Sequence, residues 1–334
     1  RDSPGDARFA VPLARRHLLE NRGQDALHVL ETALSKGGES ASLKRELSHV
    51  LREQGEFEQA LEHARSAVHA DPTPTSESEL ATTVMAAGAD YQEAQALLTS
   101  LVERFPVDQG LWALYATALR YTENASAYRS LVDYDTVIQV RKITCQQDYA
   151  TLADFLAVIR QSLLGLHITK QHPVEQSMLH GTQTLDDLFS RREPAIQQLT
   201  AALAEQLTPV IAALPKHTNH PLYRRNTGEF SFSNSWSVRL WRDGFHKNHF
   251  HSQGWLSSAF YLTVPPEVAQ GGEGWIKFGE PGFRAREPLP ADYWVKPIEG
   301  ALVVFPSYLW HGTEPLHTAS ERMTVGYDVL PGTS

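Results

Sequence analysis

The sequence contains a single cysteine, Cys145, which excludes a disulfide bond within the chain and is typical of proteins from a reducing compartment. It also lacks any apolar run near the roughly 18 residues that a membrane-spanning helix requires. Residues 1–16 have no apolar stretch of the kind found in a signal peptide. These absences predict a cytoplasmic protein. Because the first residue is Arg1 and not methionine, we expect an N-terminally trimmed chain.

Positive charge is also scarce. The 39 acidic and 30 basic residues give a formal net charge of −9, and lysine and arginine form no basic run. A charge balance of this sign argues against nucleic acid as a partner. The 42% hydrophobic and 21% charged residues are typical of a soluble globular protein, and 334 residues are enough for two domains.

The first part of the chain repeats at a regular step. Ala26, Ala60 and Ala94 are evenly spaced, and the same step links two further sets, Ala33, Ala67 and Leu101, and Leu47, Ala81 and Tyr115. Over about residues 10–130 the pattern resembles the tetratricopeptide repeat, which has a period of about 34 residues and in which helix pairs stack because none buries its apolar face alone. We therefore predict a tetratricopeptide-like helical repeat domain over residues 1–133, with a generic helical bundle as the alternative.

Residues 134–334 follow a different pattern, which we predict to be a second domain. β-Branched residues indicate a strand at 135–143, and two helical stretches lie in the supporting region 148–214. In the expected core, 229–331, short apolar segments bounded by Gly, Pro, Asn and Asp predict strands at 231–241, 257–265, 274–280, 301–311 and 322–331. Such strands favour a sandwich or barrel over a parallel sheet, and make the whole chain an α+β multidomain protein.

Three histidines, His246, His249 and His251, lie within six positions just before one of these strands. Side chains alternate along an extended segment, so that His249 and His251 face one side and His246 faces the other. His311 follows the apolar run 301–306 and is a candidate third ligand from a separate element. Converging imidazoles suit Fe(II), Zn(II) or Cu(II). The alternative for each histidine is an ordinary hydrogen-bonded or solvated side chain.

Arg322 opens the last expected strand, and alternation places Thr324 and Asp328 on the same face. A guanidinium group is costly to bury in an apolar strand without an anion. Its planar donors match a carboxylate, which makes Arg322 a candidate for binding an acidic ligand. The alternative is an ion pair at the rim with Glu321 or Glu299.

Five segments in this part of the chain resemble the iron(II)- and 2-oxoglutarate-dependent dioxygenases, in particular the prolyl-hydroxylase-like bacterial oxygenases that are often fused to tetratricopeptide repeats. The segments are SWSVRL (235–240), HKNHFHSQGWLSSAFYLTVP (246–265), GEGWIKFGEP (272–281), LVVFPSYLWHGTEP (302–315) and RMTVGYDVLP (322–331), and QSMLHGTQT (176–184) ahead of them is also similar. The resemblance spans about residues 135–334. It implies a double-stranded β-helix, or jelly roll, that binds Fe(II) and uses 2-oxoglutarate as co-substrate.

The resemblance also implies a metal site. His249 and His311 match the two iron-binding histidines of the family, whereas His251 stands where most members have Asp or Glu. This departure makes the iron site one unit more positive than the usual site of two histidines and one carboxylate. It leaves two alternatives open, a site of three histidines or one completed by Asp328 or Glu273.

The co-substrate site is implied in the same way. Arg322 and Thr324 match the family's pair that binds the distal carboxylate of 2-oxoglutarate. Tyr261 and Ser257 share a face of the strand at 257–265 and are expected to help line the pocket, with core packing as the alternative. Asp328 is expected to support the site from behind the metal ligands.

The function predicted from these residues is a 2-oxoglutarate-dependent dioxygenase that hydroxylates a peptide or protein side chain or a small molecule. The helical repeats are expected to present a surface for a peptide or protein substrate. One alternative is a three-histidine dioxygenase of cupin type that binds its substrate directly and uses no 2-oxoglutarate. The other is an interaction scaffold in which the repeats are the working part and the barrel is inactive.

Overall fold

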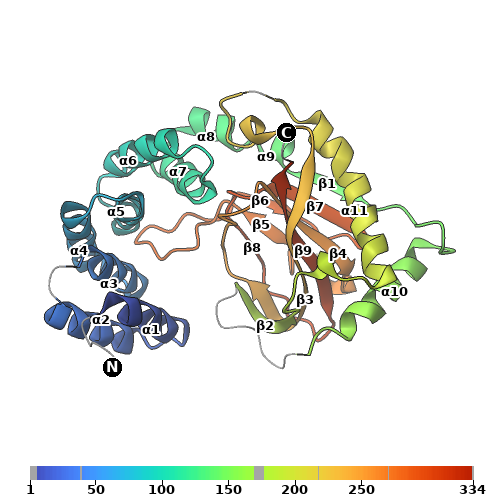
Figure 1. Ribbon diagram of the computed structural model, residues 1–334, viewed down its shortest axis with the longest axis horizontal. Coiled ribbons are helices and arrows are strands. Elements are labelled where there is room, and N and C mark those ends of the chain that lie inside the picture. Colours follow the sequence, from blue (N-terminus) through green and yellow to red (C-terminus); the bar gives the residue numbers. More distant parts are fainter. Residues whose placement is uncertain (1–5, 38–39, 169–176, 217, 270, 333–334) are drawn as a thin grey trace. The chain divides into compact units, whose positions relative to one another are not determined.

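The computed structural model describes residues 6–332 except 38–39, 169–176, 217 and 270 (Figure 1). The outer ends of the two expected domains, residues 1–5 and 333–334, lie outside the described residues. The same is true of Gln176, the first residue of the segment 176–184. The chain forms two compact units. A helical unit comprises residues up to 106, 114–128 and 281–289, and a sheet unit comprises 107–113, 129–280 and the residues from 290 onward.

The N-terminal region consists of helices, as the repeat pattern predicts. They are α1 (Ala7–Leu19), α2 (Gly23–Gly37), α3 (Ala41–Gln54), α4 (Phe57–Ala70), α5 (Pro74–Ala87), α6 (Tyr91–Arg104), α7 (Gln109–Tyr121) and α8 (Ala125–Leu131). The helices α2, α4 and α6 begin at Gly23, Phe57 and Tyr91, which are spaced by the same step as the repeated alanines. The repeat in the sequence therefore corresponds to a repeating pair of helices in the structure.

Local chemistry sets the ends of several of these helices. The side chains of Ser40, Thr73 and Asp90 accept hydrogen bonds from backbone N–H groups in the first turns of α3, α5 and α6. Gly55 and Gly88 end α3 and α5 with φ of 89° and 66°, the left-handed conformation that glycine adopts without steric cost. These signals divide the repeat into separate helices at fixed positions.

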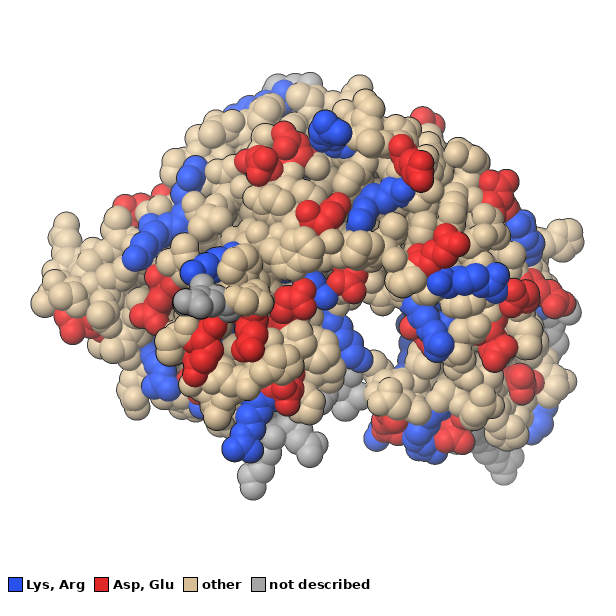
Figure 2. Space-filling model, turned by 180° about the vertical axis from the view of Figure 1, so that it is seen from behind, with Lys and Arg blue, Asp and Glu red and all other residues tan. Residues whose placement is uncertain are grey.

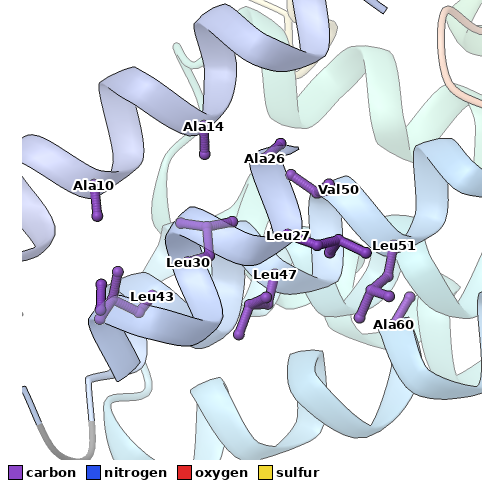
Figure 3. Close-up of a cluster of buried hydrophobic side chains, with 11 residues drawn as sticks. Ala10, Ala14, Ala26, Leu27, Leu30, Leu43, Leu47, Val50, Leu51 and Ala60 are labelled. Carbon is purple, nitrogen blue, oxygen red and sulfur yellow. The ribbon is translucent and has the colours of Figure 1, made fainter. Parts of the chain in front are cut away.

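Small residues lie where the helices cross. Figure 3 shows Ala10 and Ala14 on α1 facing a cluster that includes Leu30 and Leu47, and Ala26, Ala60 and Ala94 are completely buried. An alanine side chain lets two helix backbones approach closely, while the leucines fill the space between them. The core of the helical unit thus follows the positions at which the sequence repeats.

The sheet unit contains two antiparallel sheets. The larger has the order β1 (Gln139–Lys142), β7 (Ala301–Pro306), β4 (Leu256–Thr263), β9 (Arg322–Pro331), β3 (Phe230–His246) and β2 (Met178–Gln183). The smaller has the order β6 (Tyr293–Val295), β5 (Ile276–Phe278) and β8 (His311–Thr313). Strands distant in sequence, such as β3 and β9, are direct neighbours.

Helices support the larger sheet. In Figure 1, α10 (Leu152–Leu164) and α11 (Pro194–Ala213) run alongside it, and they contact β4 and β1 respectively. Short 3₁₀ helices lie at Leu188–Ser190, Tyr223–Arg225 and Pro266–Ala269. None of the helices among the described residues has the length and apolar character that crossing a membrane requires. On the face shown in Figure 2, acidic and basic side chains are interspersed.

The strand expected at 135–143 is shorter than predicted. Residues Tyr134–Val137 form a helical turn, α9, and only Gln139–Lys142 form a strand. The ring of Tyr134 stacks on Tyr293, with centroids 4.8 Å apart, so that tertiary packing overrides the local β preference. The strands β2 and β6 lie in segments that we did not expect to be strands, whereas the other expected strands overlap with β3, β4, β5, β7, β8 and β9.

The buried cluster of the helical unit allows a test of its contribution to stability. Leu47 is 1% exposed at the centre of the cluster, whereas Leu13 is 45% exposed on α1. We expect Leu47→Ala to lower the free energy of unfolding by about 2–5 kcal/mol, because it leaves a cavity. Leu13→Ala should change it by less than about 0.5 kcal/mol. Denaturant unfolding followed by circular dichroism measures both, and equal effects would contradict this packing.

Candidate metal centre

Three histidines from two separate parts of the sheet unit meet at one point. His249 and His251 follow the end of β3, and His311 begins β8. The backbone N–H of His249 donates to the carbonyl oxygen of His311 at 2.8 Å, and the N–H of His311 donates back to His249 at 2.8 Å. The N–H of His251 donates to the carbonyl of Ser307 at 2.9 Å. Backbone hydrogen bonds therefore fix the positions of all three residues.

The three imidazoles share one orientation, in which Nδ1 lies against an oxygen atom and Nε2 is left available to a metal ion. Their Nδ1 atoms lie against oxygen atoms, that of His249 at 2.7 Å from the carbonyl of Lys247 and that of His311 at 2.9 Å from the carbonyl of Leu309. For His251 the partner is Asp328, at 2.5 Å. With Nδ1 donating, each Nε2 keeps a lone pair for a metal ion. The three histidines offer ligand atoms that lie within 4.8 Å of one another.

The environment keeps two of these rings neutral. Burial, followed by the nearby His251, lowers the pKa of His249 to about 3. Burial, and then the other two histidines, holds the pKa of His311 well below its usual range. A metal ion binds the neutral form of imidazole, so that no proton has to be displaced from these two rings near neutral pH.

An acidic residue lies behind His251. Asp328 Oδ1 is 2.5 Å from His251 Nδ1 and also accepts a hydrogen bond from the Ser257 hydroxyl at 2.7 Å. Ser257 Oγ is in addition 2.9 Å from Ser307 Oγ and 3.1 Å from His251 Nδ1. Asp328 therefore orients the ring of His251 from the side opposite to Nε2. Glu273 is not part of the histidine group that the described residues form.

Arg322 lines the same cavity and is 1% exposed. One terminal nitrogen donates to the carbonyl of Gly274 at 2.5 Å and the other to Thr313 Oγ1 at 3.5 Å, while Nε has no hydrogen-bond partner among the described residues. Burial lowers its pKa. Glu321, one of its two possible rim partners, instead binds Arg239 at 2.5 Å. Arg322 thus lines the cavity and has donor capacity that no described residue uses.

Strand register explains why these residues share one cavity. In β9, alternation places Arg322, Thr324 and Asp328 on one face, and in β4 Tyr261 is directly opposite Thr324. Ser257 is opposite Asp328 in the same pairing but, unlike Tyr261, is not among the residues that line the cavity. Burial raises the pKa of Tyr261 to about 12, against the opposing effect of Arg322. The cavity has a volume of about 660 Å³ and contains both the histidines and Arg322.

His246 is a cavity residue that sequence reasoning missed. Its Nδ1 lies 3.1 Å from Ser177 Oγ, and both residues line the cavity with His249. The alternation rule places His246 on the side opposite to His249 and His251, but β3 ends at His246 and the chain bends at Asn248, so that regular alternation does not continue to His249. Alternation holds only along a regular strand, and the residue types in this segment did not indicate that the strand ends at His246.

Several solved structures have limited similarity to this chain. HygX from Streptomyces hygroscopicus, with nickel and 2-oxoglutarate bound, has a TM-score of 0.41 and 14% identity, covering 61% of this chain and 87% of HygX. A Pseudomonas putida prolyl-4-hydroxylase has a TM-score of 0.39 and 15% identity, covering 61% of this chain and 98% of that one. MamA from Desulfovibrio magneticus has a TM-score of 0.34 and 16% identity, covering 38% of this chain and 73% of MamA. No curated protein matches the chain.

A family model matches the part of the chain that contains this cavity. Residues 234–328 match the model described as "Putative 2OG-Fe(II) oxygenase", where 2OG is 2-oxoglutarate. The matched segment includes the three histidines, Tyr261, Arg322 and Asp328. The match confirms the resemblance found in the sequence, and with it iron(II) and 2-oxoglutarate as the cofactor and co-substrate of this kind of protein. Residues 234–328 are therefore similar to the 2-oxoglutarate- and iron(II)-dependent oxygenase domain that this family model describes.

Proposed function

We propose that the protein is an iron(II)- and 2-oxoglutarate-dependent dioxygenase that hydroxylates a peptide or protein side chain or a small molecule. The observation that carries this proposal is the common orientation of three imidazoles, each with Nδ1 against an oxygen atom and Nε2 available to a metal. In the same proposal the sheet unit is a double-stranded β-helix, and the regular helical period is that of tetratricopeptide repeats.

The histidines fit iron(II). His249, His251 and His311 would hold the ion on one side and leave its other positions to ligands from the cavity. A third imidazole in place of a carboxylate adds one positive charge to such a site. Asp328 offsets this change, because its hydrogen bond to His251 Nδ1 places a carboxylate one side chain away and makes the ring a stronger donor.

Arg322 fits the distal carboxylate of 2-oxoglutarate. It is buried, has an Nε without a partner among the described residues, and forms no ion pair with any carboxylate that the structure describes. Thr324 and Tyr261 lie beside it across the β4–β9 pairing and would add hydroxyl groups to the same carboxylate site. An acidic co-substrate would supply the missing anion.

The chain's own residues orient the reactants and exclude water. When bound, iron(II) would supply the oxidising chemistry with dioxygen as the oxidant, in which one oxygen atom goes to the hydroxylated C–H bond and the other to 2-oxoglutarate, which loses CO2 and becomes succinate. The histidines and Asp328 fix the metal position, Arg322 fixes the co-substrate, and the buried residues of β4 and β9 separate the site from solvent. The helical unit would bind a peptide or protein substrate.

The absence of a carboxylate from the histidine group that the described residues form favours a second candidate function. A three-histidine dioxygenase of cupin type would bind an organic substrate directly to its iron and would use Arg322 for the carboxylate of that substrate. The two functions differ in whether 2-oxoglutarate reaches the metal.

The first test removes the ligands one at a time. We expect His249→Ala, His251→Ala and His311→Ala each to weaken iron(II) binding by more than about 100-fold, because losing a ligand costs more than losing an outer partner. His251→Asp should still bind, since it restores a carboxylate ligand. His317→Ala, at an exposed histidine outside the cavity, should bind like the native protein. Anaerobic equilibrium dialysis measures the affinities. Native affinity in His251→Ala would show that His251 is not a ligand.

A second test compares two Asp–His pairs. Asp328→Asn should reduce iron(II) affinity by about 10- to 100-fold, because the carboxylate behind His251 is lost while the fold is kept. Asp243→Asn changes a matched pair with His317, 2.7 Å apart and exposed, and should leave iron affinity unchanged. The same dialysis assay applies. Equal behaviour of the two variants would contradict a supporting role for Asp328.

The third test concerns 2-oxoglutarate. Added to the anaerobic iron(II) protein, it should produce a weak visible charge-transfer band, which the alternative dioxygenase would lack. Arg322→Met should raise the 2-oxoglutarate concentration needed for half of this band by at least about 30-fold, because a buried charge partner is worth about 2 kcal/mol or more. Arg160→Met, at a partly exposed arginine paired with Glu321, should titrate like the native protein. A native protein that binds iron but shows no band would support the alternative.

A further inference from the structure

We propose that the helical unit contains a binding site for extended peptides of the pattern aromatic–Arg–x–Arg, and that the chain's own residues 281–289 occupy it. These residues, PGFRAREPL, connect β5 to β6 in the sequence, yet by their contacts they belong to the helical unit. They form neither helix nor strand. In Figure 1 the light-orange loop among α3–α7 is this segment.

The segment binds to the ends of two helices. Arg284 donates from its side chain to the carbonyl of Glu53 at 3.2 Å, in the last turn of α3. The backbone N–H of Arg286 donates to the carbonyl of Ala86 at 2.8 Å, in the last turn of α5. Carbonyl groups at a helix C-terminus lack partners within the helix and carry partial negative charge. One arginine side chain and one backbone N–H of the segment therefore satisfy carbonyl groups at two such ends.

Apolar contacts lie on the other face of the segment. Phe283 and Ala285 pack against Phe57, Ala86 and Ala87, whereas Arg284 and Arg286 are exposed. This alternation is that of an extended peptide bound along one side. The surface salt bridge of Arg286 with Glu58 contributes little by itself because both side chains are exposed. We therefore assign most of the affinity to the apolar contacts and to the hydrogen bonds with backbone groups.

Two tyrosines bind the end of the segment. Tyr121 donates to the backbone carbonyl of Glu287 at 2.8 Å, and Tyr91 donates to its carboxylate at 3.0 Å. The two tyrosine rings are stacked, with centroids 4.7 Å apart. A hydroxyl directed at a backbone carbonyl recognises the main chain and not one particular side chain, as peptide-binding sites do.

The site is built from equivalent positions of successive repeats. Arg284 lies against Gly55 at the end of α3, and Arg286 lies against Gly88 at the end of α5. Phe57 and Tyr91 begin α4 and α6, one repeat apart, and both contact the segment. The contacts involve only residues of the segment and of the helices. The same peptide from another molecule would therefore make the same contacts. The site thus extends the proposed peptide binding by the helical unit, and it is tested without iron or 2-oxoglutarate.

The experiment measures binding of a fluorescent peptide, PGFRAREPL, to full-length protein by anisotropy. One variant replaces residues 283–287 with Gly-Ser-Gly-Ser-Gly, and a second carries Arg284→Glu and Arg286→Glu, so that the segment stays but its charges no longer fit. Both should bind the peptide saturably, and the native chain should not, because its site is filled. The charge-reversed peptide PGFEAEEPL should not bind to the first variant.

Further substitutions in the first variant locate the site. Tyr121→Phe should weaken peptide binding by about 2- to 10-fold, through loss of one hydrogen bond. Phe9→Ala, at an exposed phenylalanine on α1, should leave it unchanged. The proposal is overturned if neither variant binds the peptide while circular dichroism shows both to be folded, or if the native chain binds it as tightly as they do. Either result leaves the iron and 2-oxoglutarate tests unaffected.

Discussion

The candidate centre depends on the reciprocal pair of backbone hydrogen bonds between His249 and His311. These two bonds bring the irregular segment after β3 beside the start of β8, although the two histidines lie far apart in the sequence. Backbone bonds hold Cα positions whatever the side chains do, so that the two imidazoles face each other before any metal binds. The other parts of the site, including His251 and the residues of β9, are arranged around this pair.

The position of Asp328 offers a physical reason why residue 251 is a histidine and not the carboxylate that most members of the family have there. In a site of two histidines and one carboxylate, the acid contacts the metal directly. Here the acid is on the far side of an imidazole, held by Ser257 and 2.5 Å from His251 Nδ1. The carboxylate of Asp328 therefore remains close to the proposed metal position, with only the imidazole ring of His251 between them. On this account the protein keeps the electrostatic balance of the site while it changes the atom that binds the metal.

The sequence predicted best where one simple period applies. The regular step of the repeats placed the helices, and alternation along β9 placed Arg322, Thr324 and Asp328 on a common face, because a regular strand has a fixed side-chain direction. Prediction failed where the backbone leaves regular geometry. The end of β3 at His246 and the bend at Asn248 broke the alternation expected between His246 and His249, and tertiary packing of Tyr134 shortened the strand expected at 135–143. The association of residues 281–289 with the helices depends on long-range contacts that no local pattern encodes.

The most direct test of the central claim is a crystal structure grown without oxygen in the presence of iron(II) and 2-oxoglutarate, with anomalous data at the iron edge. The account predicts one iron peak bound by the Nε2 atoms of His249, His251 and His311, with the distal carboxylate of 2-oxoglutarate on Arg322. An iron bound directly by Asp328 with His251 turned away, or a 2-oxoglutarate that makes no contact with Arg322, would contradict it.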